Sequence, residues 1–248
     1  MLKIIFAGTA EFAVLSLQNL LKNKKYQIMA VITQPDRPAG RGLELQKSPI
    51  KKFIRRKGGP ACPPVMQPQK IIEIKEQIKK LSPDLLIVCA YGEILPTEIL
   101  AIPRLGAINL HASILPKYRG ASPIQAAILN GNKYSGVSII QMDEKLDHGP
   151  LISQARLEIA ADETGGSLHD KLAETGARLL EFTLEKIVQS SKFKVQSENL
   201  KLKINRDIFE KKISFYNPPL LQNEKQATYT KKLNRKDGLI QPDLQSAM

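Results

Sequence analysis

Hydrophobic positions along the chain follow two periods, which alternate from the first residues onward. Short continuous apolar runs predict buried strands, and they fall at residues 2–8, 26–34, 84–90 and 106–111. Segments in which apolar residues recur every three or four positions predict amphipathic helices, and they fall at residues 10–23, 51–57, 71–82, 121–131 and 167–188. Strands interleaved with helices are typical of an α/β fold with helices on both faces of the sheet.

Two further segments, residues 135–142 and 149–159, alternate apolar and polar side chains as strands do. They lie too close together for a crossover helix, so this part of the sheet is expected to be antiparallel and the whole sheet mixed and mostly parallel. Residues 35–42 are rich in proline, glycine and arginine and are expected to form a loop. In residues 191–248 the hydrophobic period fades and lysine is frequent, which predicts an extended connector, not a domain.

Composition indicates a folded protein of a reducing compartment. The hydrophobic content of 42% is ample for a packed core. The two cysteines, Cys62 and Cys89, cannot build a disulfide framework. No stretch approaches the ~18 apolar residues of a membrane span, and the first apolar run is too short for a secretory signal. We therefore expect a soluble, cytoplasmic protein with no membrane partner.

The chain carries a formal net charge of +13, from 37 lysines and arginines against 24 aspartates and glutamates. Such a field attracts polyanions and speeds their encounter, so nucleic acid is one candidate partner. A lysine-rich surface without any specific partner is the alternative. Charge alone does not decide between them, because a basic surface indicates a nucleic-acid site only where the charges are clustered.

A polar pair stands at the end of one predicted strand. Asn109 and His111 are two positions apart, so their side chains project from the same face. The carboxyl ends of parallel strands are where α/β proteins hold their active sites. An amide can stabilise a tetrahedral oxyanion and an imidazole can move a proton, which acyl transfer to an amine requires. Purely structural hydrogen bonds at a strand end are the alternative.

Two segments downstream favour the chemical interpretation. Residues 113–125 combine two prolines and a glycine with two basic residues, which predicts a rigid, non-helical loop over the face of the polar pair. Asp147 stands in a turn before a Gly-Pro step. A carboxylate brought against His111 would fix its tautomer and favour its protonated form. The alternative for Asp147 is an ordinary turn residue.

Neither a dinucleotide-binding nor a metal-binding motif is visible in the sequence. The first strand ends in a glycine ahead of a helix, a geometry that can hold a phosphate. The G-x-G-x-x-G spacing is missing, however, and no acidic residue ends the second strand, so a dinucleotide site is not expected. No cluster of histidine, cysteine or carboxylate residues has metal-ligand spacing, so no metal is expected.

The segments NLHASILPKYRGASPIQ (109–125) and LDHGP (146–150) are highly specific. With them the chain resembles the folate-dependent formyltransferase family, from about residue 2 to 190 and again at ATYTKKLNRKDGLIQ (227–241). The resemblance implies a Rossmann-like formyltransferase domain over residues 1–190. Residues 191–248 then correspond to a lysine-rich linker and the start of a barrel-like second domain, which in the family helps to hold tRNA.

The resemblance also assigns residues to the chemistry. It implies that Asn109, His111 and Asp147 are catalytic and that the formyl donor is 10-formyltetrahydrofolate, bound without a metal. The residues that it places in the folate pocket are Ser113, Ile114, Leu115 and Pro116, together with Ala90, Tyr91 and Gly92 of the segment CAYGEILP. A flat pterin needs a mostly apolar cleft with backbone hydrogen bonds at its edge, which agrees with these assignments.

The acceptor amine follows from a further part of the resemblance. Residues 33–49 resemble the loop with which tRNA-formylating members of the family enter an acceptor stem, and Arg37 and Arg41 are its expected contacts to phosphates or bases. The resemblance thus implies formylation of the α-amine of initiator methionyl-tRNA, for translation initiation. We expect a monomer. Leu43-Glu44-Leu45 stands where the family has basic residues, which removes positive charge facing the tRNA.

Two other functions stay open. The acceptor could be a small amine, such as a glycinamide or an amino-sugar nucleotide, or the chain could be a non-catalytic RNA-binding remnant. The arginine-bearing loop at 33–42 argues against a small amine. Intact Asn109, His111 and Asp147 argue against a remnant.

Overall fold

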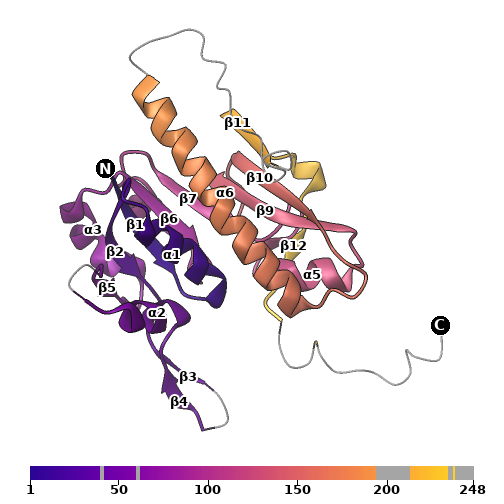
Figure 1. Ribbon diagram of the computed structural model, residues 1–248, viewed down its shortest axis with the longest axis horizontal. Helices are drawn as coiled ribbons and strands as arrows, with labels where there is room; N and C mark the ends of the chain where they lie inside the picture. The colour runs from indigo at the N-terminus through magenta and orange to yellow at the C-terminus, as the bar shows by residue number, and fades with distance from the viewer. Residues whose placement is uncertain (40–41, 60–61, 194–212, 234–236, 238–248) are drawn as a thin grey trace.

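The structure is a computed structural model that describes residues 1–39, 42–59, 62–193, 213–233 and 237. Its centre is a sheet in the order β11-β10-β9-β7-β6-β1-β2-β5 (Figure 1). The strands are β1 (Leu2–Gly8), β2 (Tyr26–Ile32), β5 (Val65–Met66), β6 (Leu85–Cys89), β7 (Ala107–His111), β9 (Tyr134–Gln141), β10 (Leu151–Glu158) and β11 (Ile213–Leu220). Strands β5, β2, β1, β6 and β7 run parallel, and β9, β10 and β11 continue the sheet antiparallel. The predicted mixed, mostly parallel sheet is confirmed.

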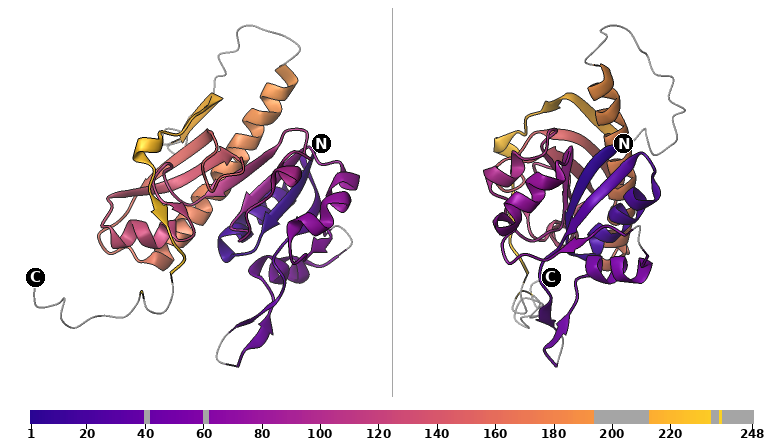
Figure 2. Two further views of the ribbon diagram at one scale, coloured as in Figure 1. Left: turned by 180° about the vertical axis from the view of Figure 1, so that it is seen from behind. Right: turned by 90° about the vertical axis from the view of Figure 1, so that its left-hand side faces the viewer.

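Helices cover both faces of this sheet, as the alternating periods predict (Figures 1 and 2). One hydrophobic cluster packs α1, α2, α5 and α6 against one face, and a second cluster packs α3 and α4 against the other. The helices and short 3₁₀ turns are η1 (Glu11–Ala13), α1 (Val14–Lys22), α2 (Pro49–Lys57), η2 (Ile71–Ile74), α3 (Lys75–Leu81), α4 (Thr97–Leu100), α5 (Pro123–Leu129), α6 (Gly165–Phe193) and η4 (Glu224–Gln226).

Strand β1 shows why the central strands are apolar throughout. Ile4 and Phe6 belong to the first hydrophobic cluster, whereas Ile5 and Ala7 belong to the second. Successive side chains of a strand point to opposite faces, and helices cover both. A strand in the centre of the sheet, covered on both faces, therefore has a continuous hydrophobic run as its sequence.

Residues 35–42, expected to form a loop, instead begin a hairpin. Strand β3 (Arg37–Ala39) pairs antiparallel with β4 (Glu44–Gln46), and the hairpin projects from the body of the molecule beside α2 (Figures 1 and 2). The loop prediction is wrong here because proline, which is typical of loops, is tolerated in an edge strand. Helix α2 begins where Ser48 accepts a hydrogen bond from the Lys51 amide, with proline in the first helical turn.

The described residues after α6 pack onto the domain. Strand β11 joins the sheet beside β10, and β12 (Tyr229–Thr230) pairs parallel with β8 (Arg119–Gly120), in the loop that follows β7. Residues 213–233 thus form more ordered structure than an extended connector. The division at residue 190 into domain and linker stays a prediction. In the described part of the chain, no helix combines the length and the apolar surface needed to cross a bilayer.

Candidate active site

The structure brings Asn109, His111 and Asp147 into contact. Asn109 and His111 end β7, and Asp147 lies in the turn between β9 and β10. The Asn109 Nδ2 atom donates to Asp147 Oδ1 at 2.9 Å. The His111 Nδ1 atom lies 3.4 Å from Asp147 Oδ2, and the side chains of His111 and Asp147 are 8% and 9% exposed. Three polar side chains thus meet at the carboxyl end of a parallel strand, and we call Asn109, His111 and Asp147 the polar triad.

Backbone geometry holds the Asp147 carboxylate in this position. The Gly120 amide donates to Asp147 Oδ2 at 2.9 Å. Asp147 itself adopts φ of 48°, the left-handed region that few residues other than glycine occupy. Two residues on, Gly149 packs so tightly against the Gln141 carbonyl that a side chain has no room there. The turn therefore presents the carboxylate in one orientation.

Both ring nitrogens of His111 face hydrogen-bond acceptors. The Nε2 atom lies 2.8 Å from the Tyr118 carbonyl oxygen, and Nδ1 faces the Asp147 carboxylate. A neutral imidazole has only one N–H, so only the protonated ring can donate to both partners. Asn109 differs, because Asp147 accepts one of its two amide N–H groups and no other described residue accepts the second, which can therefore meet a ligand. The arrangement offers an amide donor, an imidazole ring and a carboxylate.

The loop that follows β7 is held by side chains of β9 and β10. The Leu115 amide donates to Ser138 Oγ at 3.1 Å, and the Leu115 carbonyl accepts from Gln154 Nε2 at 2.8 Å. Ser113 donates to the Lys117 carbonyl at 2.6 Å, which closes the loop on itself. The predicted folate-contacting residues Ser113, Ile114, Leu115 and Pro116 all lie in this loop, of which Ser113 and Leu115 are buried and Ile114 and Pro116 half-buried.

The second predicted folate segment follows β6, the neighbour of β7. Ala90 and Gly92 are exposed and have φ of 46° and 90°. Tyr91 between them is buried, and burial raises the pKa of its hydroxyl well above the ordinary value. The Tyr91 carbonyl accepts from Thr9 Oγ1 at 2.7 Å, and the Ala90 carbonyl accepts from the Thr9 amide at 3.2 Å. These bonds tie the segment to the end of β1.

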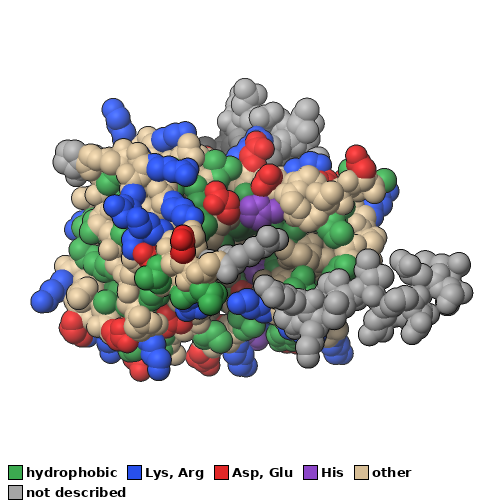
Figure 3. Space-filling model, turned by 90° about the horizontal axis from the view of Figure 1, so that it is seen from below, with side chains coloured by type: hydrophobic (Ala, Val, Ile, Leu, Met, Phe, Trp, Pro, Cys, Tyr) green, Lys and Arg blue, Asp and Glu red, His purple; other side chains and the backbone are tan. Residues whose placement is uncertain are grey.

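The segments after β1, β6 and β7 emerge at one edge of the sheet, because these strands are parallel neighbours. Seen toward this edge, the molecule is hollowed near its centre, and a histidine and several acidic side chains lie beside the hollow (Figure 3). Strand register places Cys89 opposite Leu110, so the loops that follow β6 and β7 leave the sheet at the same level. The two predicted folate segments therefore border the same face as the polar triad.

Helix α2, beside the hairpin, forms a basic flank of this face. Arg37 is exposed and donates to Gln34 Oε1 at 2.9 Å, whereas Arg41 lies outside the described residues. Lys51 donates to Asp36 at 2.7 Å, and hydrogen bonds from Lys51 and Gln67 lower the pKa of the Asp36 carboxyl. The basic side chains on the exposed face of α2 are Lys52, Arg55, Arg56 and Lys57.

The remaining histidines have other partners. The His148 Nδ1 atom lies 2.6 Å from Asp143 Oδ2. The His169 ring packs edge-on against Phe12, with the ring centroids 5.7 Å apart. The His169 side chain is 29% exposed and is therefore partly packed.

Residues near the triad that the sequence interpretation did not assign come from two places. Tyr118 and Gly120 lie within the rigid loop and contact the triad through backbone atoms. Gln222 lies in the C-terminal segment, by which we mean residues 213–233, and donates to the backbone carbonyls of Asp147 and Gly149. The specific RGASPIQ segment pointed to the loop, but no local signal marks Gln222.

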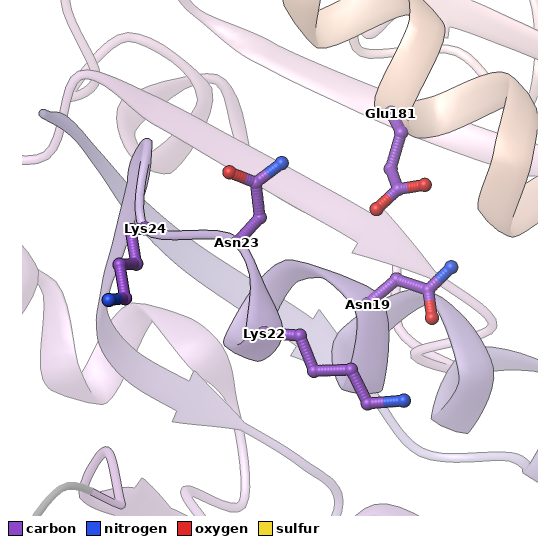
Figure 4. A pocket seen from close by; sticks show the side chains of 5 residues that line it. All are labelled: Asn19, Lys22, Asn23, Lys24 and Glu181. Carbon is purple, nitrogen blue, oxygen red and sulfur yellow. The ribbon is translucent and has the colours of Figure 1, made fainter.

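Among the described residues, no group of three or more histidine, cysteine, aspartate or glutamate side chains could hold a metal ion. A separate hollow lies at the opposite edge of the sheet, where Glu181 reaches from α6 toward the end of α1 (Figure 4). It is lined by Asn19, Lys22, Asn23, Lys24 and Glu181. Because the turn before β2 forms part of it, this hollow lies at the amino ends of the parallel strands, away from the triad.

Comparisons with known proteins agree with this geometry. A family model described as formyl transferase matches residues 2–184. A methionyl-tRNA formyltransferase of Clostridium tetani is 50% identical over 194 residues, which is 77% of this chain and 61% of that protein. One from Marinobacter nauticus is 41% identical over 240 residues, or 96% of this chain and 68% of that protein. The chain thus spans about three fifths of the length of the Clostridium tetani relative.

A solved structure shares the fold. An N-formyltransferase from Helicobacter canadensis, in complex with folinic acid and dTDP-3-aminofucose, superimposes with a TM-score of 0.61. It is 22% identical, and the match covers 96% of this chain and 72% of that one. The family model covers well over half of the chain, and the Marinobacter nauticus relative is matched over two thirds of its length. On both grounds the chain belongs to the formyl transferase family.

Proposed function

We propose that this protein transfers the formyl group of 10-formyltetrahydrofolate to the α-amine of methionine carried on initiator tRNA. The observation that carries the proposal is the contact of Asn109, His111 and Asp147 at the carboxyl end of β7. Membership of the formyl transferase family supports formyl transfer, and the relatives at 41% and 50% identity support methionyl-tRNA as the acceptor. A cytoplasmic location and a monomeric state stay predictions.

Each of the three side chains has a role that its contacts permit. The N–H of Asn109 that Asp147 does not use donates to the formyl oxygen as negative charge develops there. The protonated ring of His111 adds a positive charge beside it. Asp147 accepts the proton that the attacking amine loses, since a carboxylate offers about four acceptor positions and only some are taken here. The amine nitrogen gains the formyl group, and the folate nitrogen that loses it takes up a proton.

The two segments beside the triad suit a flat, largely apolar folate. Leu115 is buried between β9 and β10, so the 113–116 loop keeps its shape without a ligand. Ala90 and Gly92 have little or no side chain, which leaves the backbone of their segment open to hydrogen bonds at a ring edge. None of these roles requires a metal ion.

The basic flank supports a polyanionic acceptor. Arg55, Arg56 and Lys57 form no ion pair with any residue of the described part of the chain, so their charge is available to a ligand. Lysine and arginine side chains gather over the half of the hollowed face that includes α2 (Figure 3). Clustered basic charge beside an active site is what phosphate contacts to RNA require.

A small amine is the second candidate acceptor. It is favoured by Glu44, which places a negative charge near the end of the hairpin between the exposed Leu43 and Leu45. A tRNA phosphate would be repelled there, whereas a small acceptor would not reach that far from the triad. The basic face of α2 offsets this charge, and we therefore retain methionyl-tRNA.

The test compares initial rates of formyl transfer from 10-formyltetrahydrofolate to three acceptors. These are initiator methionyl-tRNA, phosphoribosylglycinamide and a dTDP-linked amino sugar. We expect N-formylmethionyl-tRNA as the product, with the small amines reacting far more slowly at equal concentration. A faster reaction with either small amine would overturn the choice of acceptor, and no reaction with any amine would overturn formyl transfer.

A further inference from the structure

Arg119 is a fully buried cation whose partners all come from the C-terminal segment. Its side chain is 0% exposed. It donates from Nε and Nη2 to Gln222 Oε1, at 3.2 and 2.8 Å, and from Nη1 and Nη2 to the two carboxylate oxygens of Glu224, at 2.9 and 2.6 Å. A fifth bond runs from Nη1 to the Tyr229 hydroxyl at 3.1 Å. We call Arg119, Gln222, Glu224 and Tyr229 the arginine clamp.

These bonds use the full capacity of the guanidinium group. Arginine has five N–H donors, and each of them has an acceptor in the clamp. A buried charge is strongly unfavourable unless it is paired and hydrogen-bonded. The hydrogen-bonded Glu224 carboxylate raises the pKa of Arg119, and Arg119 lowers the pKa of Glu224. The clamp is therefore a built arrangement and Arg119 stays charged.

Gln222 connects the clamp to the turn that carries Asp147. Its Oε1 atom accepts from Arg119, and its Nε2 atom donates to the Asp147 carbonyl at 2.9 Å and to the Gly149 carbonyl at 2.8 Å. Only one orientation of the amide fits, because arginine can only donate and backbone carbonyls can only accept. Arg119 thus fixes the amide, and the amide fixes the turn.

The turn needs such support. Asp147 has a left-handed backbone, a conformation that is unfavourable for residues other than glycine and persists only where surrounding contacts impose it. Gln222 bonds the carbonyl of Asp147 itself, and Gly120 bonds its carboxylate from β8. Strand β12 in turn pairs with β8, so both supports depend on the C-terminal segment.

We propose that Gln222 is a positioning residue of the site: held by Arg119, which Glu224 pairs in turn, it orients the Asp147 turn so that the carboxylate meets Asn109 and His111. This inference rests on the proposed formyl transfer. Among the described residues, the Gln222 side chain hydrogen-bonds only Arg119 and the backbone carbonyls of the turn, and neither folate segment. Its loss should therefore slow the chemical step and leave donor binding unchanged.

The decisive variant is Gln222→Glu, which keeps the acceptor for Arg119 but removes the N–H groups that hold the Asp147 and Gly149 carbonyls. Gln226→Glu is the matched control, because Gln226 is exposed and its side chain makes no hydrogen bond to any described residue. A misplacement of about 1 Å at a catalytic group can lower a rate by about a hundredfold. We expect kcat to fall at least tenfold in Gln222→Glu, with KM for the folate donor within twofold, and no change in Gln226→Glu.

A second readout is independent of turnover. The chain has three histidines, so the ring resonances of His111 can be assigned by nuclear magnetic resonance with a His111→Ala reference. We expect these resonances to shift in Gln222→Glu and not in Gln226→Glu, because only the first displaces Asp147. Unchanged His111 resonances, an unchanged kcat, or a fall in kcat that merely follows the loss of folded protein would each overturn the proposal. An inactive wild-type protein would contradict formyl transfer, while the His111 resonances would still decide the role of Gln222.

Discussion

At the residue scale, the site is a set of donors and acceptors matched around one carboxylate. Asp147 receives the Asn109 amide on one oxygen and the Gly120 backbone on the other, with His111 beside it. Asp147 was identified from a short specific segment, LDHGP, and the structure places it beside residues that precede it by 36 and 38 positions. The contact that gives the residue its chemistry is thus long-range, although the segment that marks it is local.

Replacement of Asp147 by asparagine removes the negative charge of the side chain and keeps its size, so it tests the charge apart from the size. The amide has the same size, but it has one acceptor oxygen where the carboxylate has two. The N–H group of either Asn109 or Gly120 therefore loses its acceptor and faces the new NH2 group. His111 also loses its counter-charge. We expect kcat to fall by about two to four orders of magnitude, the range for loss of an acid–base group, with folate-analogue affinity unchanged. Asp162→Asn, at an exposed position, is the control; near-normal turnover in a folded Asp147→Asn protein would contradict this role.

Gly120 is required for the backbone contact between β8 and β12. Its φ is 106°, and a Cβ atom there would lie closer to the Thr230 carbonyl oxygen than the two atoms can approach. Gly120→Ala should lower the free energy of unfolding by about 2–4 kcal/mol, from backbone strain plus overpacking. Gly131→Ala is the matched control, with φ of 56° and open space around the position, and should cost about 1 kcal/mol. Equal midpoints of urea unfolding for the two variants would show that β12 leaves room for a side chain at position 120.

At the scale of elements, the buried strands were predictable and the edge elements were not. Runs such as 84–90 are apolar at successive positions, and a short run of this kind predicts a strand that is buried on both faces. Strands β3 and β4 span three residues each, and β11 contains two prolines and is mostly exposed, so neither has a hydrophobic period. In the sequence, Arg119 is one of the two basic residues of the 113–125 loop, and its partner Glu224 lies 105 positions away. Pairing of this kind leaves no local pattern.

The exposed face of α2 should supply phosphate contacts. Each contact to a phosphate of duplex nucleic acid contributes about −0.9 to the slope of log K against log salt. Replacement of Arg55 and Arg56 by glutamine should weaken tRNA binding and flatten this slope by up to about two units. The control replaces Lys75 and Lys80 of α3, which covers the other face of the sheet. Salt titrations that coincide for the wild type and the α2 variant would remove α2 from the interface.

At the scale of the whole molecule, one edge of the sheet gathers segments from the full length of the described chain. The segments after β1, β6 and β7 emerge there, Asp147 reaches it from the β9–β10 turn, and residues 222–230 close over the loop after β7. The basic α2 flanks the same face (Figure 3). The sequence marked the triad and the loop, but not the dependence of both on the C-terminal segment.

Folate binding should need neither tRNA nor a divalent ion. The loop around Leu115 is held by protein side chains, and the residues assigned to the pocket contain no carboxylate or imidazole that would take a metal. We expect a 10-formyltetrahydrofolate analogue to bind with the same affinity in buffer with chelator as with added magnesium, as measured by calorimetry. A requirement for the ion, or for tRNA, would show that the pocket is incomplete without it.

The most direct measurement is single-turnover transfer of a labelled formyl group from 10-formyltetrahydrofolate to initiator methionyl-tRNA, by the wild-type protein and by His111→Ala. His111 lies between the Tyr118 carbonyl and the Asp147 carboxylate, and in the proposed mechanism its ring stabilises the developing oxyanion. We predict labelled N-formylmethionyl-tRNA from the wild type and a rate at least about a hundredfold lower from the folded variant, with folate-analogue binding retained. Equal rates for the two proteins, or no labelled product from the wild type, would contradict the account.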